Sequence, residues 1–229
     1  MALLEVCCGS PESVAAAVTG GARRVELCAD LEQDGLTPPP EWIRETKSQY
    51  PGLTVHVLIR PRAGDFAYSP EEADEMASQI RDALEAGADG IVIGALTPDG
   101  DVDTALMKRL ISEIPPERAS ITFHRAFDVC RRPFDALEQI IGLGCDRILT
   151  SGQGPTVVEG SDMLRELRRR AAGRILILPG GGVTPGNAAR SLARTGCTEI
   201  HASASETRNG RKTTSAARVA AIRQAISGL

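Results

Sequence analysis

The sequence is poor in the residue types that proteins use to bind nucleic acids and sugars. Aromatic residues make up 3% of its 229 residues, with a single tryptophan, so stacking platforms for bases or sugars are scarce. The formal net charge is −4, and no basic run is longer than Arg168 to Arg170. Nucleic-acid binding is therefore not expected.

Long apolar runs and paired cysteine motifs are also missing. No apolar stretch approaches the roughly 18 residues that identify a membrane-spanning helix. None of the six cysteines forms a Cys-x-x-Cys motif, and no charged leader precedes the first apolar segment. We therefore expect no membrane partner, free thiols rather than disulfides, and a cytoplasmic location.

What the sequence does have is a regular alternation of short strand-like runs with longer amphipathic segments. Helical spacing is clearest from Ser69 to Ala86, where Ser69 and Glu72 form a capping box with Pro70 at the first helical position. The strand-like runs number eight: Leu3–Cys8, Arg24–Cys28, Thr54–Arg60, Gly90–Gly94, Ser120–Arg125, Arg147–Ser151, Arg174–Pro179 and Thr198–Ser203.

The same helix-to-strand turn precedes every second strand. Each copy has a glycine that suits the left-handed end of a helix, at Gly21, Gly87, Gly144 and Gly196, and a small residue follows it. Eight βα units predict an α/β fold of the TIM (β/α)8 barrel type, formed by residues 1–229 as a single domain. A doubly wound sheet is the alternative, although the first strand lacks the glycine fingerprint of a dinucleotide fold.

A TIM barrel carries its active face at the rim formed by the C-terminal ends of the strands. At the end of the fifth strand an apolar run gives way to His124, Arg125 and Asp128. Other strand ends add hydrogen-bond donors at Arg60, Arg62, Ser151, Gly152, Gly180, Gly181 and Gly182. An anion of the phosphate or carboxylate type would find donors there, although three consecutive glycines also suit a simple tight turn.

Roles at this rim follow from side-chain chemistry. If the protein is an enzyme, His124 is the candidate general acid or base, with Glu26 as its proton partner. Asp128 either orients His124 or caps the helix expected near Pro133. His201 lies inside the last strand and is expected to be a core histidine.

Acidic residues interrupt the first two strands, at Glu5 and Glu26. Because side chains alternate along a strand, Glu5 shares a face with Cys7, Glu26 with Cys28, and His56 with Arg60. If these faces point inward, the barrel holds carboxylates, arginine and imidazole together. They form either a functional site or a buried structural ion-pair network.

Cys7 and Cys28 are the candidate metal ligands, because each ends one of two neighbouring strands. Two thiolates without a second His/Cys pair suit low-coordinate Cu(I) better than tetrahedral zinc. The alternative is packing, since free cysteine commonly behaves as a small buried apolar residue. Cys145 and Cys197 illustrate it, because they take the place of alanine in the repeated turn.

The chain resembles the copper homeostasis CutC family. The matching stretches are Leu4–Cys7, Arg24–Cys28, Gly35–Pro38, Ile59–Arg62 with Gly64–Phe66, Thr122–Asp128, Leu149–Gly152 and Pro179–Gly182. The resemblance implies a TIM barrel, a cytoplasmic location, a homodimer or larger homo-oligomer, and a role in copper handling. It also implies copper ligands at Cys7 and Cys28.

The sequence departs from the family pattern in four places. Asp34 stands where a glycine is usual, Pro39 replaces a serine, and Ala63 replaces the middle glycine of the Arg-Pro-Arg-Gly-Gly-Asp motif. The segment from Glu206 to Thr214 is shorter than the family norm, which affects any lid or subunit contact that a longer loop would supply.

Two main functional hypotheses follow from these features. In the first, the protein binds Cu(I) through Cys7 and Cys28 and buffers or delivers it. In the second, it is an enzyme that acts on a small phosphorylated or carboxylated metabolite at the barrel rim. A scaffold that works through oligomer contacts is a third hypothesis.

Overall fold

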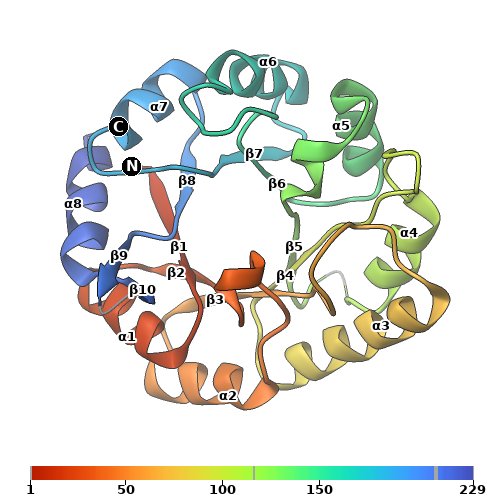
Figure 1. Cartoon of the computed structure of the whole chain (residues 1–229), viewed down its shortest axis with the longest axis horizontal. Helices are drawn as coiled ribbons and strands as arrows, with labels where there is room; N and C mark the ends of the chain where they lie inside the picture. The colour runs from red at the N-terminus through yellow and green to blue at the C-terminus, as the bar shows by residue number, and fades with distance from the viewer. Residues whose placement is uncertain (1, 116, 209–210, 229) are drawn as a thin grey trace.

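The structure is a computed structural model that describes residues 2–115, 117–208 and 211–228. In this part of the chain, eight parallel strands form a ring, which Figure 1 shows end-on with helices around it. The strand order is β7-β6-β5-β4-β3-β2-β1-β8, and a parallel bridge between Gly180 and His201 joins β7 to β8. The predicted TIM barrel is confirmed.

The eight barrel strands have nearly the predicted bounds. They are β1 Leu3–Cys8, β2 Arg24–Leu27, β3 Thr54–Leu58, β4 Gly90–Ile93, β5 Ser120–Phe123, β6 Arg147–Thr150, β7 Leu176–Pro179 and β8 Glu199–Ala202. Where the bounds differ, the strands are shorter than predicted. At the ends of β3, β5 and β6 the residues outside the strands include Arg60, His124 and Ser151, which lie in the rim loops.

Helices separate the strands and cover the outside of the ring. They are α1 Pro11–Thr19, α2 Pro40–Gln49, α3 Pro70–Glu85, α4 Thr104–Ser112, α5 Pro133–Gly142, α6 Ser161–Ala171, α7 Ala188–Thr195 and α8 Ala216–Ile226. Two short 3-10 helices, η1 Leu31–Gln33 and η2 Arg125–Val129, follow β2 and β5 at the rim.

Helix α3 shows how local sequence sets this packing. The Ser69 side chain accepts a hydrogen bond from the Glu72 N–H, and the Glu72 carboxylate accepts one from the Ser69 N–H. The helix buries a face of residues at helical spacing, namely Ala73, Met76, Ala77, Ile80, Ala83 and Leu84. Five of these six residues, all but Ala73, belong to the main hydrophobic core, which also contains outward-facing strand residues such as Val57 and Ile91. Met76 and Ile80 are the most buried residues of this helix face.

The repeated turn adopts the predicted geometry. Gly21, Gly87, Gly144 and Gly196 have φ angles of 85°, 101°, 79° and 72°, a region that residues with a Cβ atom avoid. Each glycine therefore allows a helix to end and the next strand to begin within a few residues. The turns lie at the end of the barrel opposite the candidate site.

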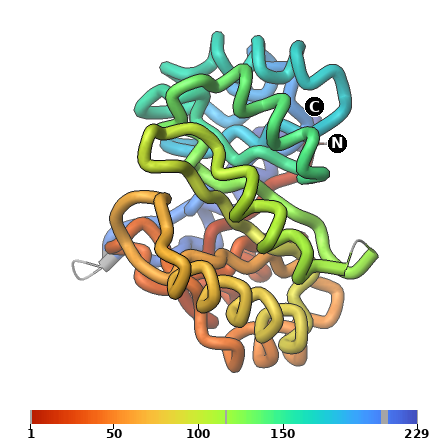
Figure 2. Tube along the Cα trace, turned by 90° about the vertical axis from the view of Figure 1, so that its right-hand side faces the viewer, coloured from red at the N-terminus to blue at the C-terminus, as the bar shows by residue number. Residues whose placement is uncertain are grey.

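Two further features complete the chain. Strands β9 Ser205–Arg208 and β10 Arg211–Thr214 form an antiparallel hairpin, so the segment from Glu206 to Thr214 lies largely in this hairpin, apart from residues 209 and 210, which are outside the described residues. Figure 2 shows the hairpin at the same end of the barrel as the segment that links β3 to α3. No helix in the described ranges is long and apolar enough to cross a membrane.

Candidate functional site

The interior of the barrel contains a network of charged side chains centred on Glu5. The Glu5 carboxylate lies 2.7 Å from Arg24 Nε, 2.9 Å from His56 Nδ1 and 2.9 Å from His201 Nδ1. Burial alone would raise the pKa of Glu5, but the hydrogen bonds from His201 and His56 hold it well below the usual value. Glu5 is therefore a buried, ionised acceptor that three neighbouring strands share.

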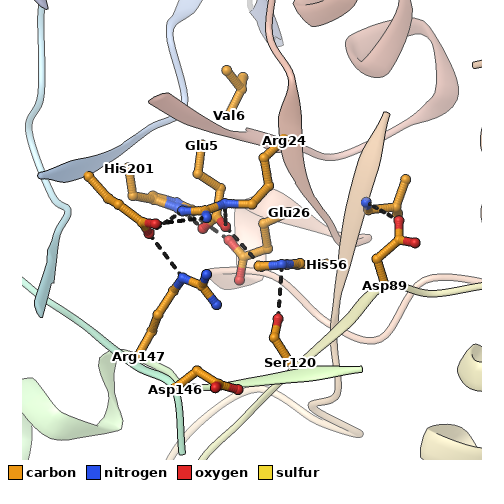
Figure 3. A network of polar contacts seen from close by, with 12 residues as sticks. Glu5, Val6, Arg24, Glu26, His56, Asp89, Ser120, Asp146, Arg147 and His201 are labelled. Atoms are coloured by element: carbon orange, nitrogen blue, oxygen red, sulfur yellow. Dashed lines mark hydrogen bonds and ion pairs between the residues drawn. The ribbon is translucent and has the colours of Figure 1, made fainter. Parts of the chain in front are cut away.

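The network extends on both sides of Glu5, as Figure 3 shows. Arg24 and Arg147 both contact Glu199, with distances of 2.5 Å from Arg24 Nη2 and 2.9 Å from Arg147 Nε to the same carboxylate oxygen. His56 Nε2 lies 3.2 Å from the Ser120 hydroxyl. The ion-pair network that the strand alternation allowed is thus present, and its charged groups pair with one another.

The two candidate thiols meet inside the barrel. Cys7 Sγ and Cys28 Sγ lie 3.7 Å apart, and Cys28 belongs to a small inward-facing apolar cluster with Leu58 and Val92. Cys7 is half-buried, whereas Cys28 is fully buried. The contact with Cys28, together with burial, raises the pKa of the Cys7 thiol well above its usual value.

His201 and Glu26 complete this cluster. One potential ligand atom from each of Cys7, Glu26 and His201 lies within 4.8 Å of the other two, and His201 Nε2 is 3.4 Å from Glu26 Oε2. Burial lowers the pKa of His201, but the contacts with Cys7 and Glu5 outweigh it and raise the pKa well above the usual value. Burial also raises the pKa of Glu26.

His201 is buried and hydrogen-bonded to Glu5, as the sequence indicated for a core histidine. What the sequence did not indicate is its place beside Cys7. His201 lies opposite Glu5 in the pairing of β8 with β1, the last and first strands of the barrel. Strand alternation along β8 alone does not reveal that pairing. A signal was available only in the closure of the predicted barrel, which makes the first and last strands neighbours.

On the other side of the rim, Asp128 occupies donors of two of the residues that were predicted to bind an anion, Arg125 and Ser151. Its carboxylate accepts hydrogen bonds from the Ser151 N–H at 3.0 Å, the Ser151 hydroxyl at 3.0 Å, the Gln153 N–H at 3.2 Å and the Thr150 hydroxyl. Arg125 Nε donates to it at 2.7 Å. Asp128 thus acts as an internal anion, and its hydrogen bonds are neither to His124 nor to the start of α5.

The predicted glycines shape this part of the rim. Gly152 donates its N–H to the Thr150 hydroxyl, and Gly180 donates its N–H to the Thr150 carbonyl. Gly181 and Gly182 have φ angles of 104° and 70°, and a Cβ atom at Gly181 would lie 3.5 Å from the Arg125 guanidinium carbon. The run therefore makes a tight turn that passes close to Arg125.

Arg60 and Arg62 differ in their surroundings. Arg60 is buried and donates to the carbonyl oxygens of Gln33, Gly35 and Gly64 through its Nη atoms. Arg62 is half-buried and donates to Glu72 from Nε at 2.5 Å and to Asp65 from Nη2 at 2.9 Å. Arg62 thereby ties the segment between β3 and α3 to the capping box of α3.

His124 lies at the end of β5, beside Arg60. Its Nδ1 atom accepts a hydrogen bond from the Ala126 N–H at 3.1 Å, so the proton of the neutral ring is on Nε2. Burial, helped by the positive charge of Arg60, lowers the pKa of His124 to about 3. No hydrogen bond or ion pair joins His124 to Glu26 among the described residues, so the two do not form a direct proton-transfer pair in this structure.

Four buried polar atoms near this histidine have no hydrogen-bond partner: Arg60 Nε, Tyr68 Oη, Thr122 Oγ1 and His124 Nε2. An unsatisfied buried donor costs about 1–3 kcal/mol in folding free energy, so a group of four is unusual. Tyr68 and Thr122 were not predicted as site residues. Tyr68 follows β3 in a rim loop, and Thr122 shares the inward face of β5 with His124, so position in the barrel was the available signal.

Comparisons with known proteins agree with this architecture. The profile of the CutC family matches residues 2–206. A CutC family protein of Parabacteroides distasonis is 48% identical over 202 residues, which are 88% of this chain and 82% of the relative. A second, from Bacteroides fragilis, is 50% identical over 204 residues, 89% of this chain and 80% of the relative.

Solved structures give the same result. The copper homeostasis protein CutC of Streptococcus agalactiae has a TM-score of 0.84 and 32% identity, and the match covers 89% of this chain and 99% of that one. An N-(5'-phosphoribosyl)anthranilate isomerase from Pyrococcus furiosus has a TM-score of 0.64 and 13% identity, with full coverage of both chains, which shows a shared fold alone. The family match over most of the chain, together with the identities to its members, shows that this protein belongs to the CutC family.

Proposed function

We propose that the protein binds Cu(I) through the thiolates of Cys7 and Cys28 and buffers or delivers it. The observation that carries this proposal is the distance of 3.7 Å between the two sulfur atoms. Zinc–thiolate bonds are about 2.3 Å long, and two bonds of that length span at most about 4.6 Å. Both sulfurs can therefore bind one ion of similar size without a change in the backbone.

The chemistry of the donor set favours a soft metal ion. Thiolate ligands select Cu(I), Zn(II) and iron–sulfur clusters, and two sulfurs suit an ion that accepts few ligands. His201 and Glu26 supply further donor atoms next to Cys7. Glu5 holds the Nδ1 side of His201 and leaves Nε2 directed toward Glu26, as a second-shell carboxylate does for a metal-binding histidine.

Protons compete with the metal at this site. The raised pKa of Cys7 means that the free protein holds its thiol protonated at neutral pH. Metal binding then releases that proton, so affinity increases with pH.

The proposed role belongs to the cytoplasm, where thiols stay reduced, and the six free cysteines support that location. We also propose a homodimer or larger homo-oligomer as the working state. Copper homeostasis in the name of the Streptococcus agalactiae structure supports copper as the cargo.

An anaerobic Cu(I) competition titration against a chromophoric chelator tests the proposal. We expect the wild type to remove one equivalent from the chelator and the Cys7→Ser, Cys28→Ser double variant to remove none. Cys145→Ser is the matched control, because Cys145 is a buried thiol in a helix-to-strand turn with no cysteine partner. Equal behaviour of the wild type and the double variant would contradict the proposal.

A further inference from the structure

We propose that Arg60, Tyr68 and His124 form a second binding site, for the carboxylate of a small metabolite. The site lies at the C-terminal ends of β3 and β5 and does not include either thiol. It is therefore independent of the copper proposal. The four unpartnered polar atoms are the observation that carries it, because a ligand is the simplest source of the missing hydrogen bonds.

The missing partner is a hydrogen-bond acceptor. Arg60 Nε is a donor only, and His124 Nε2 carries the proton because Nδ1 already accepts from the Ala126 N–H. The hydroxyls of Tyr68 and Thr122 can both donate. No carboxylate of the described residues bonds to any of these four atoms. The Nη atoms of Arg60 donate to backbone carbonyl oxygens, so within the described ranges its positive charge has no counter-ion.

The aromatic ring of Phe66 packs against both Arg60 and His124. The Arg60 guanidinium carbon lies 5.1 Å from the ring centre, and the His124 ring centre lies 5.0 Å from it. Both side chains are buried, with 6% and 4% of their surface exposed. Arg60 and His124 therefore present their free donors in one water-poor region, where a charge-assisted hydrogen bond is strong.

Backbone geometry directly after β4 fits this arrangement. Gly94 faces His124, and a Cβ atom there would come within 2.6 Å of His124 Nδ1. A side chain at this position would push the imidazole ring away from its present place. The glycine thus leaves room for the histidine that the site requires.

The segment between β3 and α3, residues 59–69, covers the site. It carries Phe66 and Tyr68, and Figure 1 shows it arching across the rim on the side of β4. Arg62 fixes its middle to Glu72 at the start of α3. Because the cover is closed over the free donors, the site takes a small ligand and shields its charge from water.

The other rim anion position differs in one decisive way. There the donors of Ser151 and Gln153 already bind Asp128, so the protein supplies its own carboxylate. Around Arg60, the described residues supply no such carboxylate. A carboxylate from outside would complete the second position in the way that Asp128 completes the first.

The test uses oxalate and inorganic phosphate as probes of the whole protein. We expect oxalate to raise the melting temperature and to shift the His124 Nε2 resonance in ¹⁵N NMR spectra, which is easily assigned among three histidines. If phosphate produces these changes and oxalate does not, the ligand is a phosphate ester, and the proposal of a carboxylate ligand is wrong. No response to either anion would overturn the site.

Two variants show whether the response comes from this site. Tyr68→Phe removes only a hydroxyl, and His124→Asn keeps an acceptor for the Ala126 N–H while it removes the Nε2 donor. We expect each to weaken oxalate binding about tenfold, whereas Arg132→Gln, an exposed cation paired with Asp101, leaves it unchanged. Wild-type binding in both site variants would overturn the proposal. The Cys7→Ser, Cys28→Ser variant should bind oxalate normally, so the two proposals fail separately.

Discussion

Two regions of the barrel interior contain buried charge, and they treat it differently. Around Glu5, on β8, β1, β2 and β3, carboxylates alternate with arginine and imidazole at 2.5–2.9 Å. Around Arg60, at the ends of β3 and β5, donors are buried without acceptors. Burial of an unpaired polar group is unfavourable. We therefore infer that the paired network around Glu5 stabilises the fold, whereas the unpaired donors around Arg60 bind a ligand.

The largest effect on stability should come from the loss of the Glu5 carboxylate, which is the centre of the paired network. Glu5→Gln leaves Arg24, His56 and His201 without their shared negative charge, and we expect a loss of about 3–5 kcal/mol in the free energy of unfolding. Urea unfolding measures it. Glu166→Gln, which removes a half-buried helix carboxylate that pairs with two exposed arginines, should leave the midpoint nearly unchanged. Equal midpoints for both variants would show that the Glu5 network is dispensable.

The internal anion of the rim should come next in size. Asp128→Asn replaces one acceptor oxygen by an amide donor that faces the Ser151 and Gln153 N–H groups. We expect a loss of about 2–3 kcal/mol in urea unfolding, because buried donors lose their acceptor. A loss that added sulfate restores would sharpen the comparison, because an external anion would then occupy the position of the carboxylate.

The unpaired region should make stability depend on pH through His124. Its folded pKa is about 3, below the unfolded value of about 6.5. The unfolded chain therefore takes up a proton first as the pH falls below about 6.5, so stability is present above that pH and is lost between about 6.5 and 3. Between pH 7.5 and pH 5 we expect a loss of about 2 kcal/mol.

The comparison of wild type with His124→Asn isolates this effect in urea unfolding curves. All other ionisable groups remain in the variant, so the difference in pH dependence belongs to His124. Identical pH dependence in the two proteins would mean that His124 is not a buried neutral imidazole.

The smallest expected effect has the opposite sign. Tyr68→Phe removes a buried hydroxyl that has no partner in the free protein, so we expect a gain of about 1 kcal/mol in the free energy of unfolding. Tyr50→Phe is the matched control, because its hydroxyl is not among the buried unpartnered atoms, and it should change nothing. Destabilisation by Tyr68→Phe would show that the hydroxyl is already satisfied.

Local sequence was sufficient to predict the barrel. The capping box at Ser69 and the turn glycines at Gly21 and Gly87 act within a few residues, and both adopt the predicted geometry. The sequence left open whether the face of Glu5 and that of His56 point into the barrel, and the contact between these two side chains shows that they do.

The partners of the site residues were harder to predict, because they depend on register between distant strands. His201 contacts Glu5 only through the pairing of β8 with β1, and Asp128 finds Ser151 only through the pairing of β5 with β6. Alternation gives the face of each side chain but not its neighbour across the barrel. The pairing of Cys7 with Cys28 was accessible because β1 and β2 are consecutive strands.

The most direct test of the copper proposal is X-ray absorption at the copper edge on protein loaded with one equivalent of Cu(I) under anaerobic conditions. The account predicts two sulfur scatterers in the first shell of the wild type and none in the Cys7→Ser, Cys28→Ser variant. A first shell made only of nitrogen and oxygen in the wild type would contradict it.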